Sequence, residues 1–143
     1  MVLTLVEPES SGISGGAFAI YWDKANKSLQ SFDGREKAPM AADGKLFQQD
    51  GKNMNWWNAL AGGRAVGVPG VVAMMEKVHQ QHGKLPWAEL FDDAIKLSED
   101  GFEISPKLGA SIARGTNPAL GRYEASWNYF FPDGQPLRAG VIK

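Results

Sequence analysis

The stretch 17-AFAIYWDKANKSLQSFDGRE-36 decides the fold, because it predicts a β-hairpin. Residues 17–23 are rich in aromatic and β-favouring side chains, as in a mostly buried strand. Residues 28–36 alternate in the manner of a second strand, and residues 24–27 suit the turn between the two. Pro39 ends the second strand, since proline lacks the N–H that a β-ladder requires.

The segments on either side of the hairpin give weaker signals. Residues 2–6 look like a strand, and residues 10–16 form a polar, glycine-rich bend. Residues 40–63 read as a loop with several glycines. Trp56 and Trp57 lie within it, and we interpret them as packing a loop or a helix start onto the core rather than as a ligand platform.

Three helices are predicted after this loop. The first has Pro69 in its first turn and Gly83 as its C-terminal cap, and its apolar face is expected to consist of Val71, Val72, Met75 and Val78. The second covers residues 87–100 and ends at Gly101. The third begins with Ser105 as N-cap and Pro106, ends near Gly115, and is followed by turns and an aromatic cluster at 127–131. A hairpin followed by helices predicts an α+β fold, with residues 1–143 forming one domain without an internal boundary.

Composition excludes several classes of function. The chain has 143 residues, is 43% hydrophobic and 22% charged, and carries a net charge of −1. Its basic residues are scattered, so no nucleic-acid-binding surface is expected. The absence of cysteine excludes disulfides, thiolate metal sites and a cysteine nucleophile. We find no membrane-spanning run and no signal peptide, since the opening residues lack a basic region and a long apolar stretch.

Other polar patterns are poor candidates for catalysis or metal binding. His79 and His82 lack a third ligand in any metal motif and are better explained as complementing the negative end of a helix. The acidic pairs at 92–93 and 99–100 are adjacent residues that do not share a helix face. Ser14 lies in a G-x-S-x-G string, but a strand follows it where the nucleophile motif requires a helix. No metal and no cofactor are predicted.

Arg35 is the remaining candidate, placed between Asp33 and Glu36 at a predicted strand end. It could form an ion pair with either acid or be an exposed cation. Alternatively, its guanidinium could bind the carboxylate of a ligand with two parallel hydrogen bonds. The residue pattern alone leaves both interpretations open.

Several motifs together resemble the γ-glutamyltranspeptidases, in particular part of their large subunit. They are 6-VEPESSGISGGAFAIYWD-23, 33-DGREKAP-39, 67-GVPGVVAMMEKVHQQHGKLPWAELFDDAIKLSEDGF-102 and 105-SPKL-108. The resemblance implies part of an N-terminal-nucleophile hydrolase fold, an αββα sandwich. It also implies a precursor that cleaves itself, so that a new N-terminal threonine attacks the γ-glutamyl amide of glutathione or a related compound. The acyl group then passes to water or to an amino acid.

The resemblance assigns Arg35 to the α-carboxylate of the γ-glutamyl group, with Asp33 and Glu36 orienting its guanidinium. The catalytic threonine has no counterpart in this chain, and both ends look like interior sequence, so we expect a part of a longer protein that is inactive alone. The implied partners are the remainder of the large subunit and the small catalytic subunit, and the implied location is periplasmic or secreted. The family commonly has four glycines where this chain has Ser14 to Ala17, a departure expected to stiffen the bend or shift specificity.

Two alternatives stay open from the sequence. A cephalosporin or glutaryl acylase of the same fold also acts on acyl groups that carry a carboxylate. A non-catalytic, stand-alone binding module would be a stable monomer. We expect poor independent stability instead, because the hairpin and the helices each have a face that needs a further layer.

Overall fold

The structure, a computed structural model, describes residues 1–115 and 117–143. Its strands are β1 (Ala17–Asp23), β2 (Ser28–Gly34), β3 (Gln48–Gln49) and β4 (Lys52–Asn53). Its α-helices are α1 (Leu3–Val6), α2 (Trp56–Leu60), α3 (Val71–His82), α4 (Asp92–Asp100), α5 (Pro106–Arg114) and α6 (Glu124–Phe130). Short 3-10 helices are η1 (Gly63–Ala65), η2 (Ala88–Phe91), η3 (Pro118–Gly121) and η4 (Pro132–Gly134).

The predicted hairpin is present. β1 and β2 pair antiparallel, with Ala17 opposite Gly34 and Asp23 opposite Ser28. β2 ends at Gly34, two positions earlier than expected, so the chain has already left the strand at Arg35. Side chains alternate between a half-buried and an exposed face along β1, so the expectation of a mostly buried strand at 17–23 was wrong. The described residues cover only one of its two faces. The hairpin therefore has one covered side and one open side.

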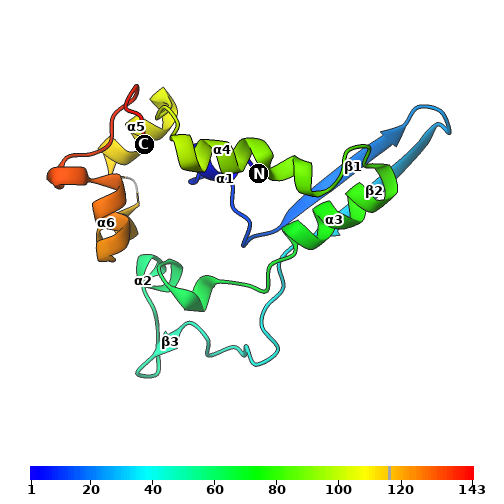
Figure 1. Cartoon of the computed structure of the whole chain (residues 1–143). Helices are drawn as coiled ribbons and strands as arrows, with labels where there is room; N and C mark the ends of the chain where they lie inside the picture. Colours follow the sequence, from blue (N-terminus) through cyan, green and yellow to red (C-terminus); the bar gives the residue numbers. More distant parts are fainter. Residues whose placement is uncertain (116) are drawn as a thin grey trace.

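Helix α3 covers one face of the hairpin (Figure 1). Phe32 of β2 is buried, and so are Val71 and Met74 on α3. The predicted helix is confirmed, with Gly83 as its C-cap. Pro69, expected in its first turn, lies outside the helix, because Gly70 is the N-cap and α3 begins at Val71. The predicted apolar face is only partly right. Met74 faces the strands, whereas Val72 and Met75 are exposed to about 40%. An i, i+3 pair is enough to contact a narrow two-stranded hairpin, which leaves the neighbouring positions uncovered.

A second buried cluster lies around α5. It consists of Phe102, Ile104, Leu108, Ile112 and Leu137. α5 confirms the third predicted helix, with Ser105 as N-cap, Pro106 in the first turn and Gly115 in the left-handed conformation.

The segment at 137–143 lies against the segment that leads into α5. Phe102 and Lys143 exchange backbone hydrogen bonds of 2.9 Å in both directions. Ile104 N–H donates to the carbonyl of Val141 at 2.8 Å. These bonds place Leu137 in the cluster around α5.

The second predicted helix forms in two pieces. Residues 88–91 form the 3-10 helix η2, and α4 begins only at Asp92. α4 ends at Gly101 as expected, where a positive φ of 86° favours glycine. Leu97 of α4 packs against the cluster around α5.

The segment at 2–6, expected as a strand, is the short helix α1. No strand pairs with it among the described residues, and local bonds satisfy its backbone. Thr4 N–H donates to the Met1 carbonyl at 3.0 Å, and Leu5 N–H donates to the Val2 carbonyl at 2.9 Å. The strand prediction there was wrong because β-favouring residues form a strand only beside another strand.

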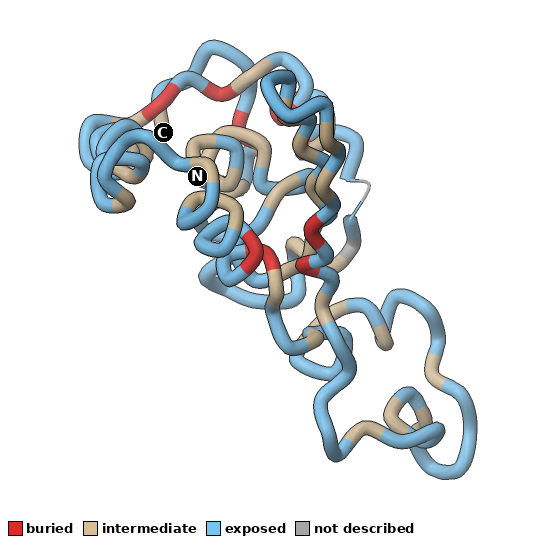
Figure 2. The backbone as a smooth tube through the Cα atoms, turned by 90° about the vertical axis from the view of Figure 1, so that its right-hand side faces the viewer, coloured by how far each residue is buried: buried red, intermediate tan, exposed pale blue. Residues whose placement is uncertain are grey.

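The segment at 40–63, expected as a loop, contains β3, β4 and α2. Asn55 caps α2 by accepting from the N–H of Trp57 at 3.0 Å. Trp56 is 69% exposed and Trp57 is 45% exposed, so the expectation that they pack onto the core was wrong. Residues 35–70 include no buried position, and Figure 2 shows the loop that extends downward without any buried residue.

The aromatic cluster at 127–131 belongs to α6 and the residue after it, a helix that was not predicted. The rings of Trp127 and Phe131 stack, with centroids 4.3 Å apart. α6 lies near α2 in Figure 1, and the guanidinium of Arg122 donates to the Ala61 carbonyl at 3.2 Å. This bond ties the segment at 35–70 to the C-terminal part of the chain at Ala61.

Candidate functional site

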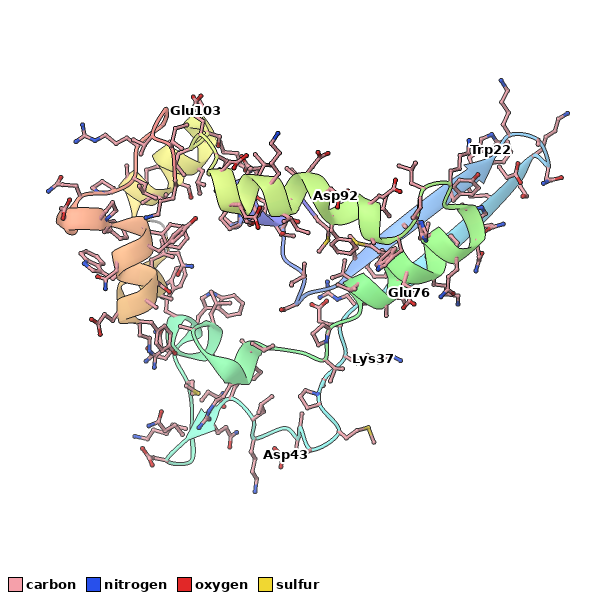
Figure 3. All side chains as sticks on the ribbon, viewed as in Figure 1. Trp22, Lys37, Asp43, Glu76, Asp92 and Glu103 are labelled. Atoms are coloured by element: carbon pink, nitrogen blue, oxygen red, sulfur yellow. The ribbon has the colours of Figure 1, made fainter. Side chains whose placement is uncertain are left out.

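Arg35 lies just after β2, where the chain leaves the hairpin and continues to Lys37 (Figure 3). Its side chain is 64% exposed, so the guanidinium is accessible to a ligand. Its backbone N–H donates to Asp33 Oδ1 at 2.9 Å. Asp33 therefore contacts the main chain of Arg35, and any effect that it has on the guanidinium passes through the backbone.

Glu36 is the other neighbour of Arg35. Arg35 Nη2 lies 3.5 Å from Glu36 Oε1, at the long end of an ion pair. The Glu36 side chain is 31% exposed, but its Oε2 is buried and has no hydrogen-bond partner among the described residues. One carboxylate oxygen is thus directed to the guanidinium, while the other lies inside the packing behind it.

The glycine-rich bend before β1 lies against the start of α3. The carbonyl of Gly15 accepts from the N–H groups of Gly70 and Val71 at 3.1 and 3.2 Å. Ser14 is exposed and β1 follows the bend, a context that does not match a nucleophile motif. A cavity of about 480 Å³ lies beside the bend, lined by residues from both the bend and α3, and Arg35 is not part of its lining.

The two histidines of α3 have structural contacts. His79 Nε2 lies 2.7 Å from the Leu85 carbonyl, and His82 Nε2 lies 2.8 Å from Gln30 Oε1. The His82 ring stacks on Tyr21 with centroids 3.8 Å apart. Within residues 1–115 and 117–143 no group of three or more His, Asp or Glu side chains could hold a metal ion.

Two glycines that contact the candidate site, Gly67 and Gly70, were not predicted as site residues. The string 67-GVPG-70 indicated only a helix start and part of the family motif. In the structure Gly70 lies against Gly34 and Gly67 lies against Glu36. Two glycines flanking a proline just before a helix were the available signal, because glycine in such a position often marks a close approach of two backbones.

Comparison with known proteins decides the family. The family model described as Gamma-glutamyltranspeptidase matches residues 1–142. The chain belongs to the gamma-glutamyltranspeptidase family.

Relatives and solved structures agree with this assignment. Glutathione hydrolase 3 of Arabidopsis thaliana is 35% identical over 136 residues, which cover 95% of this chain and 20% of the relative. The crystal structure of Helicobacter pylori gamma-glutamyltranspeptidase has a TM-score of 0.87 at 32% identity, covering 99% of this chain and 40% of that one. The cephalosporin acylase of Bacillus halodurans has a TM-score of 0.79 at 27% identity, covering 99% of this chain and 26% of that one.

These likenesses confirm the predicted α+β fold as part of an N-terminal-nucleophile hydrolase fold. The chain spans about a fifth of the length of the Arabidopsis relative. No helix in the part of the chain that the structure describes has the length and apolar character needed to cross a bilayer.

Proposed function

We propose that this chain forms one wall of the substrate site of an enzyme that cleaves γ-glutamyl amides, glutathione among them. The observation that carries the proposal is Arg35. Its exposed guanidinium lies at the end of β2, within the motif that the family resemblance assigns to the substrate α-carboxylate. The single 3.5 Å contact with Glu36 leaves other N–H groups of the fork free for a carboxylate.

In this proposal the nucleophile lies outside these 143 residues. A threonine at the N-terminus of a small subunit attacks the γ-glutamyl amide, with its own α-amine as the base. The acyl group passes to water or to an acceptor amino acid. This chain contributes binding and orientation, works with the remainder of the large subunit and with the small subunit, and is inactive alone. The complete protein acts in the periplasm or outside the cell.

The test is Arg35→Ala in the full-length protein, assayed with a γ-glutamyl anilide. Loss of charge-assisted hydrogen bonds to the α-carboxylate is expected to lower kcat/KM. The loss of transition-state stabilisation should be about 2 to 3 kcal/mol. The free energy of unfolding should change by less than about 0.5 kcal/mol, because an exposed ion pair contributes little to stability.

Arg114→Ala is the matched control. Arg114 is an exposed arginine in the last turn of α5, and its replacement is expected to leave kcat/KM unchanged. An Arg35→Ala enzyme with the kcat/KM of the wild type would remove Arg35 from the substrate site.

The likeness to a cephalosporin acylase supports a second candidate, an acylase that binds the carboxylate of a glutaryl group at Arg35. A panel of γ-glutamyl and glutaryl amides separates the two. A higher kcat/KM for γ-glutamyl amides is expected, and a preference for glutaryl amides would favour the acylase.

A further inference from the structure

The chain around Arg35 is enclosed by glycines from three separate segments. Gly16 belongs to the bend before β1, Gly34 ends β2, and Gly67 and Gly70 precede α3. A Cβ on Gly70 would come within 2.5 Å of the Gly34 carbonyl oxygen. A Cβ on Gly16 would come within 2.5 Å of the backbone N of Glu36 and would also collide with Glu36 Oε2.

Gly67 differs from Gly16 and Gly70, whose added Cβ atoms would meet mainly backbone, because a Cβ on Gly67 would contact mainly the Glu36 side chain. A Cβ there would lie 3.0 Å from Glu36 Cγ and 3.1 Å from Glu36 Cβ and the Lys37 carbonyl oxygen. Gly67 is not among the glycines with positive φ, so its backbone conformation does not require glycine. What Gly67 provides is space for the Glu36 side chain.

The main chain holds Gly67 and Glu36 together. The next residues along each segment, Val68 and Lys37, exchange backbone hydrogen bonds of 2.8 and 3.3 Å. The main chain at Glu36 therefore cannot move away from Gly67 without breaking these bonds. On its other side the Glu36 carboxylate lies against Gly16.

We propose that Gly67 is a positioning residue for Arg35. It leaves room for Glu36 to lie between the bend and the α3 lead-in, so that Glu36 Oε1 meets the guanidinium from one defined direction. A side chain at position 67 displaces Glu36, and the guanidinium loses the partner that orients it. This inference rests on the proposed role of Arg35 in binding the substrate carboxylate.

The test is Gly67→Ala in the full-length protein. The contacts of 3.0 to 3.1 Å require shifts of a few tenths of an ångström, so the variant is expected to fold. KM for a γ-glutamyl anilide should rise about tenfold with kcat nearly unchanged, as expected when ground-state binding is weakened. The same anilide with its α-carboxylate converted to a carboxamide should show no change in kcat/KM between wild type and variant.

Gly63→Ala is the matched control, because Gly63 also precedes α3 and a Cβ on it would meet no atom within 4 Å. Its KM should equal that of the wild type. A second measurement, hydrogen exchange of the backbone amides at 34–37, should be faster in Gly67→Ala than in Gly63→Ala, and this result does not depend on activity.

A double-mutant cycle with Glu36→Ala completes the test. If Gly67 acts through Glu36, adding Gly67→Ala to Glu36→Ala should raise KM by much less than tenfold, whereas independent effects would multiply. A wild-type KM and wild-type exchange in Gly67→Ala would overturn the positioning role of Gly67 while leaving Arg35 in place. No effect of Arg35→Ala on kcat/KM would instead overturn the proposed function.

Discussion

At the scale of single residues, the two acids of the motif 33-DGRE-36 contact different parts of Arg35, its main chain and its side chain. Asp33 accepts from the backbone N–H of Arg35 at 2.9 Å, whereas Glu36 meets the guanidinium at 3.5 Å. Both acids were expected to orient the guanidinium, and that expectation stays a prediction. The contacts suggest that Asp33 holds the backbone of Arg35 in place and that Glu36 holds its guanidinium.

The role of Asp33 can be tested by comparing Asp33→Asn with Asp33→Ala. Asparagine keeps an acceptor oxygen for the Arg35 N–H, so KM for a γ-glutamyl anilide should stay within about twofold of the wild type. Alanine removes the acceptor and should raise KM several-fold, on the order of the 1 kcal/mol that one hydrogen bond contributes. Equal KM values for the two variants would contradict a role through the backbone hydrogen bond.

At the scale of elements, α5 is tied to the segment that precedes the glycine-rich bend. Lys107 Nζ donates to Glu7 Oε2 at 2.6 Å and lies 3.7 Å from Glu9 Oε1. The hydroxyl of Ser105 donates to Glu7 Oε1 at 3.0 Å and accepts from the N–H of Leu108 at 3.0 Å. Ser105 thus caps α5 and joins Glu7 to it at the same time.

The Glu7–Lys107 pair predicts a pH dependence of stability. The hydrogen bond from Lys107 lowers the pKa of Glu7 below its ordinary value of 4.5, and the bond to Glu7 raises the pKa of Lys107 above 10.5. The lowered Glu7 pKa gives stability that is present above pH 4.5 and lost as the pH falls through the folded pKa. The raised Lys107 pKa gives stability that is present below pH 10.5 and lost as the pH rises above it.

Urea unfolding of the full-length protein between about pH 3 and 6 checks the acidic side of this dependence. Lys107→Met should flatten the fall in unfolding free energy below pH 4.5, because Glu7 then loses the main cause of its lowered pKa. Lys96→Met is the control, since Lys96 is exposed and forms no ion pair within residues that the structure describes. Parallel curves for the wild type and Lys107→Met would contradict a native-state role for the pair.

At the scale of the whole molecule, the hairpin exposes a large apolar face opposite α3. Phe18, Ile20, Trp22 and Leu29 are between 56 and 75% exposed, and Trp22 pairs directly with Leu29 across the strands. Trp22 lies near the hairpin turn (Figure 3). A contiguous exposed apolar surface of this kind favours association.

The 143-residue chain by itself is therefore expected to self-associate at micromolar concentration. Ile20→Lys should reduce its association in analytical ultracentrifugation, because a charge then lies in the apolar face. Leu85→Lys changes another exposed apolar residue, outside the hairpin, and should have no such effect. A monomeric mass together with a sharp thermal transition in the unmodified chain would contradict this expectation.

The sequence predicted what depends on local pattern. The hairpin follows from the aromatic and β-favouring residues at 17–23 and from the alternation at 28–36, and α5 from its Ser105-Pro106 start and Gly115 end. Periodicity could not tell whether Met74 or Met75 meets the hairpin, because that depends on the side from which the strands approach. The five-residue helix α2 is too short for periodicity to reveal.

The candidate site was predictable only in part. Residue pattern alone left Arg35 between an ion pair and a ligand contact, and the family resemblance favoured the ligand. The position of Glu36 between Gly16 and Gly67 was not predictable, because it depends on two segments about fifty residues apart in the chain meeting at one side chain.

The place of Leu137 in the cluster around α5 has a consequence for synthesis on the ribosome. The hairpin and α3 lie within residues 17–82, so this unit can close soon after His82 emerges. The cluster around α5, with Leu108 and Ile112, stays incomplete until Leu137 has left the exit tunnel. α5 is therefore the helix that a chaperone acting during translation should protect for the longest interval.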